Sequence, residues 1–298
     1  MIKKAIVVFL IVFAIYNVGL HIANPSIFIP QNIKQDNTIK VQEYLYSDLN
    51  KDRVVLGSSV SAKLDKNILA ENQIYNLGFR GQSVYDGLNI IKKSNIIPKI
   101  VFIEINVLNR PASAILEDMW FYPAMVSAKK AMPALKERNQ PVNTVMLMVQ
   151  SFLQGRKKAE ISAETPVEQP IRSENKSNQG QGNFEGKYVQ KVIAEYQILP
   201  KDSLMNILMT DLKTQITDLE AKNAKIVFFE MPMHPEISKS PMINYLRELT
   251  KKNFPESKYQ YLPSVNSNDY ETRDAIHLTN ESATKYTKFF VQEVAKVR

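Results

Sequence analysis

Short apolar runs recur along the chain, and each is bounded by glycine, proline or polar residues. Runs of this kind are typical of strands that are buried on both faces of a parallel sheet. They predict strands at residues 54–59, 73–77, 99–106 and 225–231, with a short fifth strand at 259–262.

Helical periodicity follows most of these strands. Ser83 is a good N-cap, Asp86 favours a helix start, and apolar residues recur after it at helical spacing. A second amphipathic helix is predicted over 204–219, a third over 242–254, and a last one after the N-cap Thr279. Strands that alternate with helices predict an α/β fold with a parallel sheet.

Three segments do not follow this alternation. Residues 24–50 form a polar connector with a short helix expected around 39–49. Residues 111–152 are rich in Met, Pro and aromatic side chains, which suits either a helical excursion on the sheet or the lining of a cleft. Residues 155–187 are polar and predict a mobile insertion in a domain that spans 51–298.

The N-terminus carries the longest apolar stretch. Residues 5–20 are apolar on all sides, and their extension to Ala23 matches the bilayer core of about 30 Å. A small-x-small cleavage site is not evident, so an uncleaved signal anchor is favoured over a cleaved signal peptide. Lys3 and Lys4 place the N-terminus in the cytoplasm and the domain outside the inner membrane, in the periplasm or its equivalent.

Composition narrows the chemistry. The chain of 298 residues is 44% hydrophobic and lacks cysteine, which excludes disulfides, Cys-ligated zinc and thiol nucleophiles. Its three histidines are His21, His234 and His277, so a multi-histidine metal site is not expected, and no cofactor is predicted. The net charge of +8 suits anionic partners, but the basic residues form no stripe that would predict nucleic-acid binding.

Polar residues with catalytic potential fall where the predicted strands end. In an open parallel sheet, ligands bind beyond the carboxyl ends of the strands. Ser59 follows the first strand, Gly81 the second and Asn106 the third, and Asp274 and His277 precede the last helix. A hydroxyl, an imidazole that activates it, a carboxylate that orients the imidazole, and oxyanion donors are what acyl transfer requires.

Each residue also has an ordinary structural explanation, because serines and glycines form turns and a lone histidine is often partly buried. The combination in this order is much more specific than any member. A nucleotide-binding Rossmann protein is disfavoured, since no Gly-x-Gly-x-x-Gly follows the first strand.

Three blocks resemble the GDSL/SGNH hydrolase family, namely Gly-Ser-Ser-Val at 57–60, Asn-Leu-Gly-Phe-Arg-Gly at 76–81 and Asp-Ala-Ile-His-Leu at 274–278. The resemblance implies a flavodoxin-like, three-layer α/β/α fold with a central parallel sheet. It further implies Ser59 as nucleophile and Asp274 and His277 as its triad partners.

The same resemblance implies an oxyanion hole made by the Gly81 amide and the Asn106 side chain, with Asn109 in reserve. Two positions depart from the family pattern. Ser58 replaces the aspartate of the first block, and the third block has Glu104-Ile105-Asn106 where the family shows Gly-x-Asn-Asp.

An anchored domain of this type is similar to family members that move acyl groups on cell-envelope or exported polysaccharides. The implied function is a serine esterase or O-acyltransferase that acts on acyl, chiefly acetyl, esters of such a glycan, with a multi-span membrane O-acyltransferase as a partner. The alternative is a catalytically idle glycan-binding or scaffold subunit of the same machinery.

Overall fold

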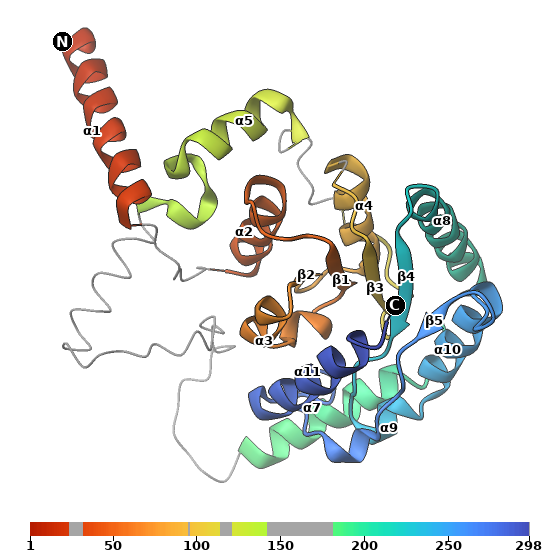
Figure 1. Cartoon of the computed structure of the whole chain (residues 1–298). Coiled ribbons are helices and arrows are strands. Elements are labelled where there is room, and N and C mark those ends of the chain that lie inside the picture. Colours follow the sequence, from red (N-terminus) through yellow and green to blue (C-terminus); the bar gives the residue numbers. More distant parts are fainter. Residues whose placement is uncertain (24–31, 95, 114–120, 142–180, 298) are drawn as a thin grey trace. The chain divides into compact units, whose positions relative to one another are not determined.

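The structure is a computed structural model that describes residues 1–23, 32–94, 96–113, 121–141 and 181–297. The chain divides into two compact units, which are described separately below (Figure 1). The first contains residues 1–49 and 117–174, and the second contains residues 50–116 and 175–298.

The second unit is built on a five-stranded parallel sheet. Its strands are β1 (Arg53–Gly57), β2 (Ile74–Gly78), β3 (Ile100–Glu104), β4 (Lys225–Phe229) and β5 (Gln260–Tyr261). The spatial order is β2-β1-β3-β4-β5, which is a doubly wound order with its switch point between β1 and β3. The predicted α/β fold with a parallel sheet is confirmed.

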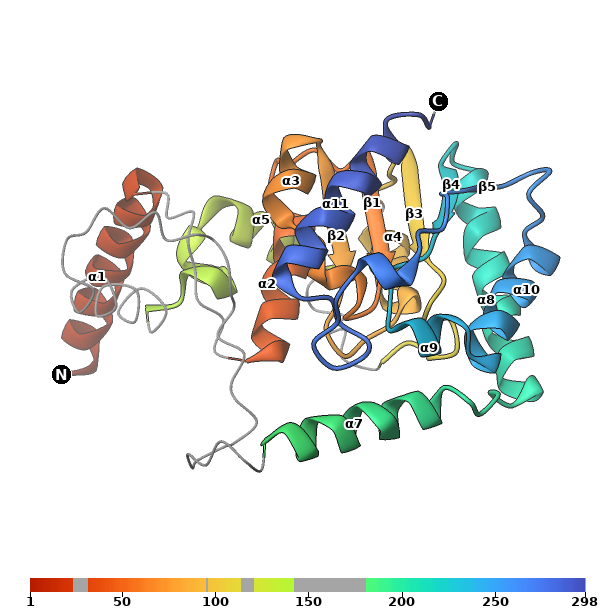
Figure 2. The same ribbon diagram turned by 90° about the horizontal axis from the view of Figure 1, so that it is seen from below.

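Helices cover both faces of this sheet (Figures 1 and 2). On one face lie α3 (Lys66–Glu71) and α11 (Asn280–Val294), and on the other lie α4 (Val84–Ser94) and α8 (Asp202–Glu220). The helices predicted after Ser83 and Thr279 and over 204–219 are therefore present. Asp86 accepts the Ser83 N–H at 2.8 Å, which closes the first turn of α4.

Aromatic and aliphatic side chains fill the space between the layers. The Phe290 ring of α11 packs edge-on against Phe102 of β3 and Phe229 of β4, with centroids 5.5 and 5.1 Å apart. On the opposite face, a Cβ on Gly87 of α4 would lie 2.8 Å from Leu56 of β1. Glycine at this position therefore lets α4 approach the sheet closely, directly behind the strand that leads to Ser59.

The remaining helices of this unit are α7 (Gln181–Glu195), α9 (Pro235–Ser238) and α10 (Pro241–Asn253). The predicted helix over 242–254 corresponds to α10. Residues 181–187, at the end of the insertion predicted over 155–187, form the start of α7. The rest of that insertion lies outside the described residues.

The first unit is helical in its described part. It contains α1 (Ile2–Ala23), α2 (Ile33–Tyr46), α5 (Pro123–Ala131) and two 3-10 turns at Pro133–Leu135 and Glu137–Asn139. The helix expected around 39–49 instead starts at Ile33, because the Asn32 side chain caps it by accepting the Gln35 N–H at 2.8 Å.

Residues 121–141 pack with the N-terminal helices. Arg138 forms an ion pair with Glu43 of α2 at 2.7 Å, and the Tyr16 hydroxyl of α1 donates to the Asn139 carbonyl at 2.6 Å. The sequence places these residues within the 51–298 domain, whereas the structure groups them with residues 1–49. The other part of the Met- and aromatic-rich segment, at 114–120 and 142–152, lies outside the described residues.

Helix α1 is long and apolar enough to cross a membrane. Its residues 2–22 have a mean hydropathy of 2.4 and are almost all exposed. A signal sequence has the same length and composition, so these properties fit both an anchor and a leader.

Candidate active site

Ser59 lies immediately beyond the carboxyl end of β1, at the switch point of the sheet. The chain turns sharply here, since the Ser58 carbonyl accepts the Ala62 N–H at 3.0 Å and the Ser58 hydroxyl accepts the Val60 N–H at 3.1 Å. Ser58 and Val60 are buried, whereas Ser59 between them is partly exposed. The turn therefore presents the Ser59 side chain to solvent from a rigid, buried base.

Asp274 and His277 lie on a closed loop before α11. The loop is fastened by an antiparallel bridge between Thr272 and Leu278. Ala275, between the two functional residues, has a left-handed backbone with φ of 70°. This conformation costs a non-glycine residue about 1–2 kcal/mol, so the surrounding bonds must hold it in place.

These two segments meet in a continuous hydrogen-bonded series. The Ser59 Oγ lies 2.8 Å from His277 Nε2, and His277 Nδ1 lies 2.7 Å from Asp274 Oδ2. The other carboxylate oxygen of Asp274 accepts the His277 N–H at 2.7 Å. The structure thus brings together the three residues that the sequence predicts as a triad, although they are separated by up to 218 positions.

The electrostatics of Asp274 suit its place in this series. Burial acts to raise the pKa of Asp274, but hydrogen bonds from the His277 ring and main chain outweigh burial and lower this pKa from 3.8 to about 2. The carboxylate is therefore charged at neutral pH. It fixes His277 with a proton on Nδ1, so Nε2 is left to accept a proton from Ser59.

Glu104 is a residue supporting this site that sequence reasoning missed. It is fully buried at the end of β3, and its carboxylate accepts the backbone N–H groups of Ser58 at 2.8 Å and Ser61 at 3.2 Å. The Ser58 hydroxyl also donates to it at 2.9 Å. A Cβ on Gly57 would overlap this carboxylate, so glycine is required there. Glu104 thus fixes the turn that carries Ser59 through hydrogen bonds on both sides of this serine.

Gly81 follows β2, the neighbour of β1. Its φ of 72° is left-handed, and a Cβ there would meet nothing within 4 Å, so the backbone conformation rather than space favours glycine. Within the described part of the chain, the N–H groups of Gly81 and Ser59 have no hydrogen-bond acceptor.

The two candidate asparagines of the third segment lie in different surroundings. The Asn106 side chain is 2% exposed and pairs with the Met231 backbone, as its Oδ1 accepts the N–H at 2.7 Å and its Nδ2 donates to the carbonyl at 2.9 Å. Asn109 is half-buried, and its amide lies 3.5 Å from the Met242 sulfur. Asn106 joins the ends of β3 and β4, which gives it a structural role whatever else it does.

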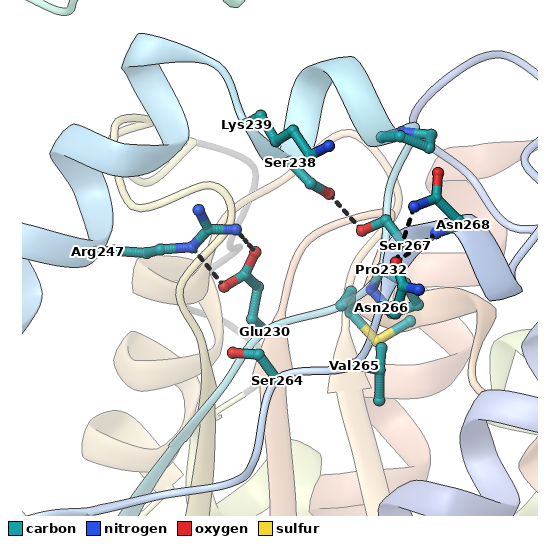
Figure 3. A pocket seen from close by; sticks show the side chains of 12 residues that line it. Glu230, Pro232, Ser238, Lys239, Arg247, Ser264, Val265, Asn266, Ser267 and Asn268 are labelled. Atoms are coloured by element: carbon teal, nitrogen blue, oxygen red, sulfur yellow. Dashed lines mark hydrogen bonds and ion pairs between the residues drawn. The ribbon is translucent and has the colours of Figure 1, made fainter.

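A cavity of about 220 Å³, with polar and apolar side chains in its wall, lies beyond the ends of β4 and β5 (Figure 3). Its wall includes Met231, the residue that holds Asn106. The polar side chains around it pair with one another, because Arg247 contacts Glu230 at 2.8 Å and the hydroxyls of Ser238 and Ser267 lie 2.6 Å apart. The cavity contains none of the predicted site residues.

Possible metal ligands were compared across the part of the chain that the structure describes. Among the residues that the structure describes, no three His, Asp or Glu side chains gather in a way that could hold a metal ion.

No protein-family model matches the chain, and no curated protein matches it. A functional assignment therefore depends on the geometry of this site and on the sequence blocks that build it.

Removal of the Glu104 carboxylate is expected to loosen the serine turn. Glu104→Ala leaves two buried N–H groups without acceptors and should lower the free energy of unfolding by about 3 kcal/mol or more. Glu104→Gln keeps an acceptor and should cost less. Denaturant unfolding of the full chain in detergent measures both, and hydrogen exchange at Ser58 and Ser61 reports the turn itself. The exposed Glu236 provides the control Glu236→Gln; equal effects of all three variants would contradict this role.

Asp274 should make stability depend on pH in the acidic range. Its folded-state pKa is depressed to about 2, so its stabilising effect is full above its ordinary pKa of 3.8 and is lost as pH falls from about 4 to 2. Asp274→Asn should therefore be less stable than the wild type by about 1–2 kcal/mol at pH 6, and this gap should close near pH 2. Urea unfolding at several pH values measures it, with Asp269→Asn as the surface control. A gap that stays constant down to pH 2 would refute the coupling.

Proposed function

We propose that the chain is an extracytoplasmic serine esterase or O-acyltransferase that acts on acyl, chiefly acetyl, esters of a cell-envelope or exported polysaccharide. The observation that carries the proposal is the Ser59–His277–Asp274 series, with links of 2.8 and 2.7 Å, at the carboxyl edge of a parallel sheet. A serine hydroxyl that donates to an imidazole oriented by a carboxylate is the arrangement that acyl transfer requires.

In this mechanism, Ser59 Oγ attacks the ester carbonyl while its proton moves to His277 Nε2. The imidazolium that forms is stabilised by Asp274 and returns the proton to the leaving alkoxide, which leaves an acyl-serine. Water or a sugar hydroxyl then loses its proton to His277, attacks the acyl-serine and releases the acyl group as acid or as a new ester.

The oxyanion formed in each step needs hydrogen-bond donors. The N–H groups of Ser59 and Gly81 are assigned this role, because they have no acceptor within the described residues. Asn106 is the proposed side-chain donor, since its amide nitrogen carries a second N–H besides the one donated to Met231. Asn109 is the alternative.

The proposed fold family and location have their own grounds. The order β2-β1-β3-β4-β5 is the flavodoxin-like order, which suits an SGNH-type hydrolase, and the resemblance of the three sequence blocks supports the same assignment. Helix α1 with Lys3 and Lys4 suits an anchor whose N-terminus is cytoplasmic. A glycan substrate and a multi-span membrane O-acyltransferase as partner follow from this resemblance.

The assignment of the nucleophile is tested by labelling with a serine-directed fluorophosphonate. The wild type should be labelled, Ser59→Ala should not, and the exposed-serine control Ser264→Ala should behave as the wild type. Hydrolysis of p-nitrophenyl acetate should fall by about 10³-fold or more in Ser59→Ala and in His277→Ala. If the wild type and Ser59→Ala react alike, the assignment fails. Glycan binding without turnover in the wild type would favour the idle scaffold instead.

Two substitutions distinguish the oxyanion roles of the asparagines. Asn106→Ala removes the pair to Met231 and should lower the free energy of unfolding by about 2 kcal/mol, in addition to lowering kcat by about 10²-fold. Asn109→Ala should lower neither to that extent. Steady-state kinetics and denaturant unfolding measure these effects. A large loss of kcat in Asn109→Ala, with kcat preserved in Asn106→Ala, would transfer the role to Asn109.

A further inference from the structure

Each loop that carries a proposed catalytic group also carries a cationic side chain. Lys63 follows Ser59 by four residues, Arg80 directly precedes Gly81, and Arg273 directly precedes Asp274. These three residues are called the cation cluster below. Arg273 is far from the other two in the sequence, so the common location of the three results from the fold.

The register of the sheet brings Arg80 to the serine turn. In the parallel pair of β1 and β2, Gly57 lies opposite Gly78, and the Phe79 N–H donates to the Gly57 carbonyl at 3.2 Å. Ser59 and Arg80 are each two residues beyond this pair. They therefore emerge from neighbouring strands at the same edge of the sheet.

The other two cations are fixed to the same site by local bonds. Arg273 donates its backbone N–H to the His277 carbonyl at 2.8 Å. This bond places Arg273 at the closed end of the loop that carries Asp274 and His277, here called the histidine loop. Lys63 ends the 3-10 turn Ser61–Lys63, and its N–H bonds to the Val60 carbonyl at 3.2 Å. Lys63 and Arg80 are half-buried, whereas Arg273 is exposed.

The charges of the cluster act on one another. Burial lowers the pKa of Lys63, and the positive charges of Arg273 and Arg80 lower it further, while Asp274 acts in the opposite direction. Lys63 is thus within electrostatic reach of both arginines and of the proposed triad. An anionic group bound near these three side chains would be attracted by all three positive charges.

We propose that the cation cluster of Lys63, Arg80 and Arg273 binds an anionic group, a carboxylate or a phosphate, on the glycan whose ester the serine attacks. Guanidinium groups suit this role because they contact either anion through two parallel N–H bonds. The inference rests on the proposed function and specifies its substrate class as an acidic glycan. It also accounts for a cluster that acyl transfer itself does not require.

Binding to an inactive variant tests the cluster apart from catalysis. Full-length Ser59→Ala in detergent is titrated calorimetrically with trigalacturonate, with its neutral methyl ester, and with glycerophosphoglycerol as a phosphodiester. Trigalacturonate or the phosphodiester should bind at least about tenfold more tightly than the methyl ester. The anion that shows this preference identifies its chemical source.

Charge removal locates the preference. Adding Arg273→Gln to the Ser59→Ala protein should reduce the preference about tenfold, and Lys63→Gln serves as a second variant if Arg273→Gln does not fold. Arg53→Gln is the matched control, because Arg53 begins β1 at the opposite edge of the sheet and should leave the preference intact. Higher salt should weaken binding of the anion but not of the methyl ester.

The outcomes separate the two proposals. Equal binding of anions and methyl ester, or a preference that survives Arg273→Gln and Lys63→Gln, overturns the cation cluster as a binding site even if fluorophosphonate labels Ser59. A preference that depends on the cluster, in a chain that fluorophosphonate does not label, supports the anion site while the acyl-transfer proposal fails.

Discussion

The buried carboxylate of Glu104 is the interaction on which the serine turn depends. A charged group is costly to bury unless hydrogen bonds satisfy it, and here the acceptors are used by Ser58 and Ser61 on either side of Ser59. Because Glu104 belongs to β3 and the turn belongs to β1, this contact also locks the two strands that flank the switch point. Ser59 is thereby held rigidly at the carboxyl edge of the sheet, beside the switch point.

The sheet was predictable because its signals are local. Each strand is a short apolar run between breakers, and β1 to β4 start and end within two residues of the predicted limits or inside them. The candidate triad was predictable for a related reason. In a parallel sheet the carboxyl ends of all strands meet at one edge, so residues placed after strands are neighbours in space however far apart they are in sequence.

The features that were not predicted depend on tertiary contacts, which leave little trace in the sequence. In the sequence, a single glutamate at the end of an apolar strand looks like a strand terminator. Only the structure shows that Glu104 is fully buried and accepts the N–H groups of Ser58 and Ser61. Helix α7 was missed because its composition is polar, and its buried side chains Val192 and Ile193 lie near its C-terminal end. For α2, the start was misplaced because the cap Asn32 precedes polar residues that are nevertheless buried.

The histidine loop shows the same principle of fixed support as the serine turn. Ala275 adopts a left-handed backbone that an alanine disfavours, yet its carbonyl accepts the His234 N–H at 2.9 Å and the Thr272–Leu278 bridge closes the loop around it. Strain of this kind persists only where the surroundings over-determine the conformation. Both halves of the series from Ser59 to Asp274 are thus set in the protein without a ligand, so the hydrogen bonds between them would need little reorganisation in the proposed reaction.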